Sequence, residues 1–194
     1  MLMPLILEGL TSTRDADGSI HAAAMGPMVD EAMSELVFRP FPTSRTYANL
    51  LRDRQGVFHI TDDVLLLTQL ALGESEPLDW QPTVVVDGAV ASGACRWYEF
   101  RVEDVDLTGE RPLFVARVVY RGRLRDFIGL NRARHAVIEA AILATRVHLT
   151  GIEPARLAVE QLRVAVEKTG GPREQAALSL VVQYLANADA EADA

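Results

Sequence analysis

The chain has 194 residues, of which 49% are hydrophobic and 24% are charged, and this balance excludes a disordered polar chain. Its net charge of −8 at pH 7 argues against general nucleic-acid binding, because the excess of Lys and Arg that neutralises phosphates is missing. One cysteine, Cys95, excludes an internal disulfide and any metal site built from several cysteines, so no metal is expected.

The first ten residues contain Glu8 and no basic region, a pattern unlike that of a secretory signal peptide. No run approaches the roughly 18 apolar residues of a membrane span. We therefore expect a cytoplasmic protein that does not associate with a membrane or with nucleic acid.

The chain begins with a predicted hairpin. Residues 5–13 resemble a strand, residues 14–18 form a turn that ends in Gly18, and residues 20–29 return as a second strand. The middle of that second strand, His21 to Met28, is rich in alanine, which is a poor strand former. Two interpretations stay open: a flat ligand lies against this strand, or the strand packs beneath a helix.

A third short strand at 36–38 leads into the segment R-P-F-P-T-S-R-T-Y-A-N, Arg39 to Asn49. A helix is predicted to follow over 47–54 and to end at Gly56. The first N–H groups of a helix lack partners, and the helix dipole is positive at that end. Hydroxyl groups and an arginine at that point favour binding of a phosphate monoester. The alternative is that Ser44 or Thr46 only caps the helix.

Further strands are predicted at 57–61, 83–86, 94–102 and 113–124, with a helix over 64–72 that is capped by residues 61–63 and stopped by Gly73. A polar connector is expected at 74–82. The last strand alternates, which predicts one apolar face and one basic face, and the basic face is either solvated or binds an anionic ligand. The apolar face comprises Phe114, Ala116, Val118, Tyr120 and Leu124, and the basic face Arg117, Arg121, Arg123 and Arg125.

Helical periodicity follows from 132 to 149 with Asn131 as N-cap, then from 153 to Gly170, and then from Pro172. Strands first and helices last predict the α+β class, a small barrel with a C-terminal helical extension. The expected division is 1–128 for the barrel, 129–188 for a helical part packed on it, and 189–194 within an acidic frayed tail that begins near Asn187.

Four stretches together resemble the flavin-reductase-like FMN-binding split barrel and, within it, domain-of-unknown-function family 447. They are T-S-T followed by D-G-x-x-H-A-A-A-M-G, then F-P-T-S-R-T-Y-A-N-L, then G-V-F-H-I-T-D-D, then F-I-G-L-N-R-A-R-H-A-V-I-E-A-A-I-L-A-T-R. The resemblance covers the chain from Glu8 to about Val182. It implies a split β-barrel, a homodimer, and FMN bound at the subunit interface.

The resemblance also implies which residues contact FMN. The phosphate would be held by Ser44, Arg45, Thr46 and Asn49, the ring edge would lie along the strand that contains Ala24, Met25 and Gly26, and Thr11 and Thr13 would be nearby. It implies no substrate, and only a contextual link to tetrahydromethanopterin-dependent one-carbon metabolism.

Four other side chains each allow more than one interpretation. His21 is a candidate to donate to the flavin or a substrate, or else a structural strand residue, and Cys95 is a redox candidate or a small core residue. His135 and Glu139 share a helix face, where an ionic pair is favoured over a metal site for want of a third ligand. Two functions remain open: an oxidoreductase that uses bound FMN for hydride or electron transfer, and a non-catalytic flavin-binding or scaffold protein.

Overall fold

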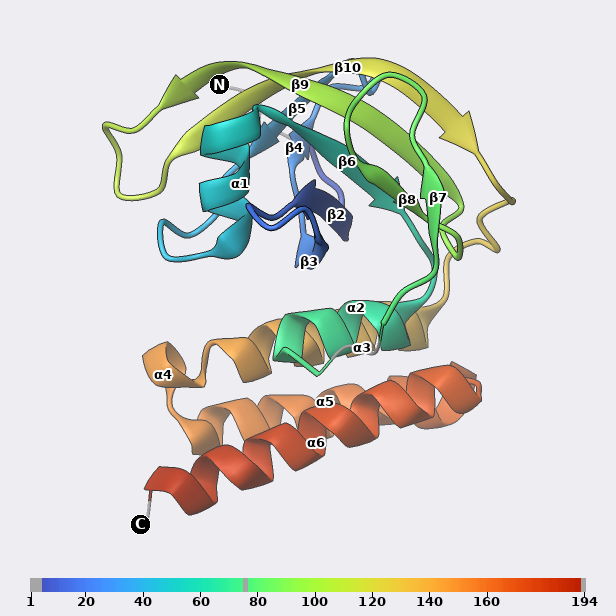
Figure 1. Ribbon diagram of the computed structural model, residues 1–194. Helices are drawn as coiled ribbons and strands as arrows, with labels where there is room; N and C mark the ends of the chain where they lie inside the picture. Colours follow the sequence, from blue (N-terminus) through green and yellow to red (C-terminus); the bar gives the residue numbers. More distant parts are fainter. Residues whose placement is uncertain (1–4, 75–76, 193–194) are drawn as a thin grey trace. The chain divides into compact units, whose positions relative to one another are not determined.

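The computed structural model describes residues 5–74 and 77–192, and they form two compact units (Figure 1). The first unit contains the residues up to 61 together with 78–127. The second contains 62–77 together with the residues from 128 onward. The segment 62–77, which lies within the first 128 residues of the chain, therefore belongs to the helical unit.

The first unit is a curled, antiparallel half-barrel in which the strand order is β1-β4-β5-β10-β9-β6-β2-β3 (Figure 1). β7 and β8 pair with each other in a small second sheet. The strands are β1 (Leu5–Ile6), β2 (Gly9–Arg14), β3 (Ile20–Met25), β4 (Met28–Val29), β5 (Glu35–Phe38), β6 (Gln55–Ile60), β7 (Trp80–Pro82), β8 (Ala89–Ala91), β9 (Arg96–Asp106) and β10 (Leu113–Arg123).

The concave side of this sheet is filled by aromatic side chains and by one helix, α1 (Arg45–Asp53). The rings of Phe38 and Phe100 lie 4.6 Å apart between centroids, and Leu50 of α1 is fully buried against the same cluster. Burial of each such side chain contributes about 1.5–3 kcal/mol, so this cluster fixes α1 on the sheet.

The prediction that Gly56 ends this helix is wrong. α1 ends at Asp53, and its C-cap Arg54, two residues before Gly56, adopts the left-handed conformation that ends the helix, with φ of 50°. Gly56 lies in β6, where an added Cβ would meet the Phe100 ring at 2.8 Å and the carbonyl oxygen of Ser12 at 2.9 Å. The glycine is therefore needed for close strand and ring packing.

The strand predicted at 83–86 is a loop, and one buried carboxylate holds it. Glu99 of β9 accepts the backbone N–H groups of Val84, Val85 and Val86 at 2.8, 2.6 and 3.0 Å, and the indole N–H of Trp97 at 3.2 Å. These N–H groups are thus satisfied by a side chain in place of a neighbouring strand.

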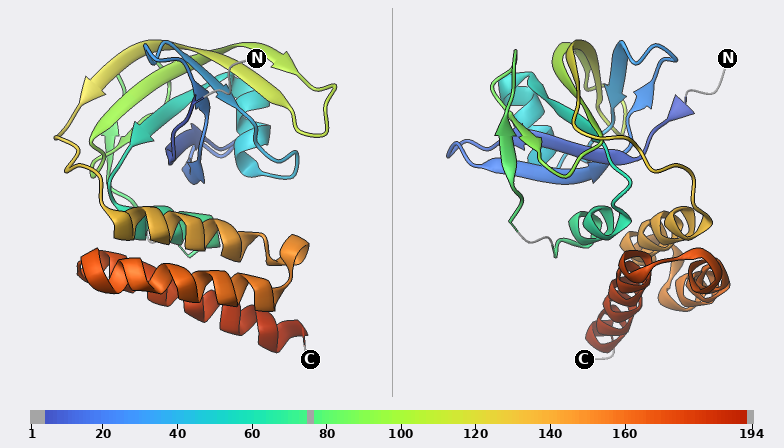
Figure 2. Two further views of the ribbon diagram at one scale, coloured as in Figure 1. Left: turned by 180° about the vertical axis from the view of Figure 1, so that it is seen from behind. Right: turned by 90° about the vertical axis from the view of Figure 1, so that its right-hand side faces the viewer.

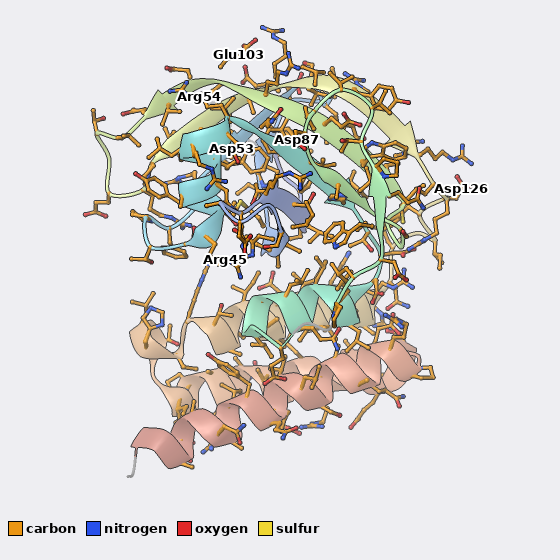
Figure 3. The ribbon with its side chains drawn as sticks, in the orientation of Figure 1. Arg45, Asp53, Arg54, Asp87, Glu103 and Asp126 are labelled. Atoms are coloured by element: carbon orange, nitrogen blue, oxygen red, sulfur yellow. The ribbon has the colours of Figure 1, made fainter. Side chains whose placement is uncertain are left out.

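The expected arginine face of β10 does not exist as one surface. A bulge between Val118 and Tyr120 shifts the register, so that residues on either side of it exchange faces. Tyr120 then lies beside Trp97 with 6.0 Å between ring centroids, away from the aromatic core. Arg117 forms an ion pair with Glu103, whose carboxylate is labelled beside β9 in Figure 3. Arg123 forms an ion pair with Asp126, labelled after β10.

The second unit is a helical bundle of α2 (Val64–Leu72), α3 (Arg132–Thr145), α4 (Val147–Thr150), α5 (Ile152–Thr169) and α6 (Pro172–Ala192). Figure 2 shows α3, α5 and α6 side by side. Their contact surfaces are rich in fully buried alanines, which allow close approach of the helix axes: Ala133, Ala136, Ala140, Ala144, Ala155 and Ala177.

The predicted helix ends are confirmed where capping chemistry is specific. Asp63 and Asn131 cap α2 and α3, and Gly73 ends α2 with φ of 77°. The single helix predicted over 132–149 is instead interrupted at Arg146. The tail expected to fray from Asn187 continues α6 as far as Ala192. None of the helices within residues 5–74 and 77–192 is long and apolar enough to cross a membrane.

Candidate functional site

The β2–β3 hairpin and α1 bring most of the predicted site residues together. Thr11 lies opposite Ala23, and Thr13 lies opposite His21, so these four side chains share one face of the hairpin. α1 contacts the hairpin at this point, and the Asn49 Nδ2 donates to the Thr13 Oγ1 at 3.0 Å. The strand register and one helix face thus build a single polar surface.

Thr11 is fully buried on this surface, yet its hydroxyl has no hydrogen-bond partner in the described part of the chain. An unpaired buried hydroxyl costs about 1–3 kcal/mol, so such groups are rare in folded proteins. The position is suited to a bound molecule that supplies the missing partner.

The start of α1 carries the hydroxyl and arginine cluster of the sequence. Ser44 is the N-cap: its Oγ accepts the Tyr47 N–H at 3.2 Å and donates to the Phe41 carbonyl at 2.8 Å. Ser44 therefore caps α1, and its hydroxyl proton is already donated to the Phe41 carbonyl. Thr46 is buried.

Arg45 differs from its neighbours because its side chain is 65% exposed and lies at the first turn of α1 (Figure 3). The backbone N–H groups of Arg45 and Thr46 are the first two of the helix and have no intrahelical partner. A guanidinium beside two free N–H groups at a positive helix end is a combination that binds anions.

Asp15, which sequence reasoning did not include, already occupies this position. Its carboxylate forms an ion pair with Arg45 and accepts from Asn49 Nδ2 at 2.7 Å. Burial acts to raise the pKa of Asp15, but the hydrogen bonds from Asn49 and Arg45 and the charge of Arg45 outweigh it, and the pKa is lowered. The D-A-D-G context identified Asp15 only as a turn residue.

His21 is half-buried on the same face. Burial lowers the pKa of its imidazole, the charge of Arg45 lowers it further, and the charge of Asp15 acts in the opposite direction. The pKa thus lies below the ordinary value, and the ring is neutral at pH 7. A neutral imidazole can donate one hydrogen bond and accept another, but it brings no positive charge to the site.

The predicted ring-contact residues, Ala24 to Gly26, lie at the end of β3 and just after it. β3 is the last strand in the sheet order, so within residues 5–74 and 77–192 its outer edge has no strand partner. The side chains of Ala24 and Met25 point to opposite faces, since the strand alternates. These residues could therefore contact one flat ligand together only through the backbone groups on the outer edge of β3.

Other candidates lie elsewhere. Cys95 is buried just before β9, and its backbone carbonyl accepts from the N–H groups of Leu124 and Arg125. His135 and Glu139 belong to α3 in the helical unit. Among the described residues no group of three or more His, Cys, Asp or Glu side chains is placed to hold a metal ion.

Comparison with known protein families gives two matches. Residues 7–125 match the N-terminal domain of the protein of unknown function DUF447, and residues 131–183 match a second DUF447 model. The border between the two matches lies close to residue 128, where the chain enters the helical unit for the second time.

Solved structures show the same fold. An FMN-bound protein from Methanosarcina mazei, of the DUF447 family model, is 22% identical with a TM-score of 0.80 over 94% of this chain and 96% of that one. Two further structures have lower similarity. An FMN-binding protein from Thermus thermophilus is 17% identical, with a TM-score of 0.52 over 63% of this chain and 72% of that one. The 2-nitrobenzoate 2-nitroreductase of Pseudomonas fluorescens is 16% identical, with a TM-score of 0.51 over 63% of this chain and 66% of that one. With the two family matches covering most of its length, this chain belongs to the DUF447 family and has a flavin-reductase-like split-barrel fold with a C-terminal helical part.

Proposed function

We propose that this protein binds FMN and places the FMN phosphate at the N-terminus of α1. The observation that carries the proposal is the exposed Arg45 guanidinium at the first N–H groups of α1, together with an unpartnered, buried Thr11 hydroxyl on the hairpin that α1 contacts. The FMN-bound member of the same family, from Methanosarcina mazei, supports the choice of ligand.

The residues present fit a phosphate monoester beside a flat ring. Arg45 and the N–H groups of Arg45 and Thr46 would hold the phosphate, and Asn49 would orient it once its amide is released from Asp15. The backbone edge of β3, with the small side chains of Ala22 to Ala24, offers donors and acceptors to the ring edge. Thr13, which already binds Asn49, would fix that amide in place.

We further propose that the protein is an oxidoreductase in which bound FMN supplies hydride or electron transfer. The contribution of the chain would be binding, orientation and exclusion of water. His21, neutral and on the same face, is the candidate to hydrogen-bond the ring or a substrate. Because the ring is neutral, one of its nitrogens could accept a proton from a bound molecule.

Two measurements test these proposals separately. Fluorescence titration of the protein with FMN and with riboflavin, which lacks the phosphate, should show clearly tighter binding of FMN, and equal affinities would contradict a phosphate site. Anaerobic mixing of the FMN-loaded protein with NADH or NADPH should bleach the flavin absorbance. A protein that binds FMN but is never reduced would be a flavin-binding or scaffold protein.

A further inference from the structure

Asp15 contacts both groups that the proposed phosphate site would use. It directly follows β2, and its carboxylate pairs with Arg45 and accepts from Asn49 Nδ2 at 2.7 Å. Its side chain is 13% exposed, whereas that of Arg45 is 65% exposed. The structure therefore contains an anion at the start of α1, and that anion belongs to the chain itself.

We propose that Asp15 sets how strongly the flavin site prefers FMN over a flavin without phosphate, because its carboxylate competes with the phosphate for Arg45 and Asn49. The inference rests on the proposed function. FMN can bind only by displacing the Asp15 carboxylate, so Asp15 lowers the affinity for a phosphorylated flavin and leaves that for a flavin without phosphate unchanged.

The charges around the site favour competition over shared binding. A phosphate monoester carries about −1.5 to −2 charges at pH 7, and Asp15 adds another negative charge. The neighbouring cations have other partners: Asp53 engages Arg52 at 2.8 and 2.6 Å, and Asp87 engages Arg14 at 2.8 Å. His21 is neutral. Arg45 alone cannot neutralise a carboxylate and a phosphate that lie a few ångströms apart.

The turn permits Asp15 to leave without loss of the hairpin. The turn is held by backbone bonds, from the Asp15 N–H to the Ser19 carbonyl at 2.8 Å and from the Gly18 N–H to the Asp15 carbonyl at 3.0 Å. The Asp15 side chain takes no part in them, and its contact with the Ser19 hydroxyl is long, 3.5 Å. Rotation of the Asp15 side chain therefore releases Arg45 while the strands stay paired.

The decisive substitution is Asp15→Asn, which keeps the shape and an acceptor oxygen for Asn49 but removes the charge. At pH 7.5 it should raise the affinity for FMN about 10-fold to 100-fold, with riboflavin affinity unchanged, because a like-charge repulsion and a competitor are both removed. Asp126→Asn is the matched control, since it removes an equal charge from an exposed ion pair with Arg123 of β10 and should leave the affinity ratio unaltered.

A second measurement uses the unaltered protein and so does not depend on the variant folding. The carboxyl carbon of Asp15 is titrated by NMR in the riboflavin-bound and the FMN-bound protein. The groups that interact with it are Arg45, Asn49 and His21, and the charges of Asp17 and Arg52. The pKa of Asp15 should be higher with FMN, because the displaced carboxylate has lost Arg45 and has gained a phosphate neighbour.

The outcomes separate the inference from the function on which it rests. The inference on Asp15 is overturned by one set of results. In that set Arg45→Ala lowers FMN affinity, but Asp15→Asn leaves the ratio of FMN to riboflavin affinity unchanged, and the pKa of Asp15 is equal in both complexes. Asp15 is then only a structural link between hairpin and helix. If the unaltered protein binds FMN and riboflavin equally and Arg45→Ala has no effect, the proposed phosphate site itself is wrong.

Discussion

Arg45 is the side chain whose removal tests the phosphate site most directly. Arg45→Ala should weaken FMN binding at least about 10-fold, because a charge-assisted hydrogen bond contributes about 1.5–3 kcal/mol, while riboflavin binding stays the same. Isothermal titration with both flavins measures the ratio. Arg39→Ala, which removes an exposed arginine from the preceding loop, is the charge-matched control and should leave it unchanged.

A substitution of Thr46 tests whether its hydroxyl stabilises the helix or contributes to FMN binding. Ser44 caps α1, so Thr46→Val should not cost the stability of a cap, about 1 kcal/mol. We expect a smaller loss of FMN affinity than for Arg45→Ala, in the same direction. Thermal unfolding of the flavin-free variant is measured together with the titration. A lower unfolding temperature with an unchanged ratio of FMN to riboflavin affinity would show that the hydroxyl only stabilises the helix.

His59 makes the stability of the barrel depend on pH. It is fully buried in β6, where its Nδ1 lies 3.1 Å from the Leu10 carbonyl and its Nε2 accepts the Ala91 N–H at 3.1 Å, an arrangement that requires the neutral ring. Burial lowers its pKa to about 4, against only a smaller opposing effect of the bond to Leu10.

The sign of the effect follows from proton uptake. Between pH 6.5 and pH 4 the unfolded chain binds a proton at this histidine and the folded chain does not, so stability falls as pH falls through this window. From pH 7 to pH 5 the free energy of unfolding should fall by roughly 2 kcal/mol on account of His59 alone. Urea unfolding at both pH values measures it. His59→Gln should reduce the difference in unfolding free energy between pH 7 and pH 5, whereas His148→Gln, at an exposed position, should leave it unchanged. An equal difference in the unaltered protein and both variants would refute the assignment to His59.

Among the elements, the helices of the second unit are joined by one buried arginine. Arg134 of α3 donates through Nε to Glu174 of α6 at 3.0 Å, and its Nη1 lies 3.7 Å from Asp62, which precedes α2. All three side chains are at most 17% exposed. Burial acts to raise the pKa of Glu174, but the hydrogen bonds from Arg134 and Gly171 outweigh it, so the pKa lies below its ordinary value.

Arg134→Met should therefore destabilise the helical unit by about 3–5 kcal/mol, since it keeps the length of the side chain but leaves buried carboxylates without their arginine. Arg163→Met is the control: Arg163 pairs with Glu160 on the exposed side of α5, where such a pair contributes at most about 0.5 kcal/mol. Urea unfolding followed by circular dichroism compares the two variants. A loss no greater than that of the control would show that Arg134 contributes nothing specific.

At the scale of the whole molecule we expect a homodimer. The barrel unit exposes large apolar side chains that a monomer would leave in water: Leu5, Ile6, Phe41 and Val84, each more than half exposed. Light scattering of the purified protein should give twice the chain mass of 21.3 kDa. A monomer at micromolar concentration that still binds FMN tightly would contradict a site shared between subunits. Leu5→Glu with Ile6→Glu should shift the equilibrium toward monomer if β1 lies in the interface.

Sequence alone determined the features that depend on short-range chemistry. The hairpin with Gly18 at its turn, the caps at Asp63 and Asn131, and the stop at Gly73 all follow from residues within a few positions of one another, so periodicity and capping rules predict them. The α+β class followed likewise from the order of strands and helices.

Only the tertiary structure decided what distant residues do to one another. Glu99 turns 83–86 from a predicted strand into a loop, and the β10 bulge divides the arginines between two faces. Packing against Phe100 places Gly56 inside a strand, and Asp15 reaches Arg45 across 30 positions of the chain. In each case a contact formed at long sequence separation outweighs a local preference that amounts to about 1 kcal/mol or less, and no local pattern encodes such a contact.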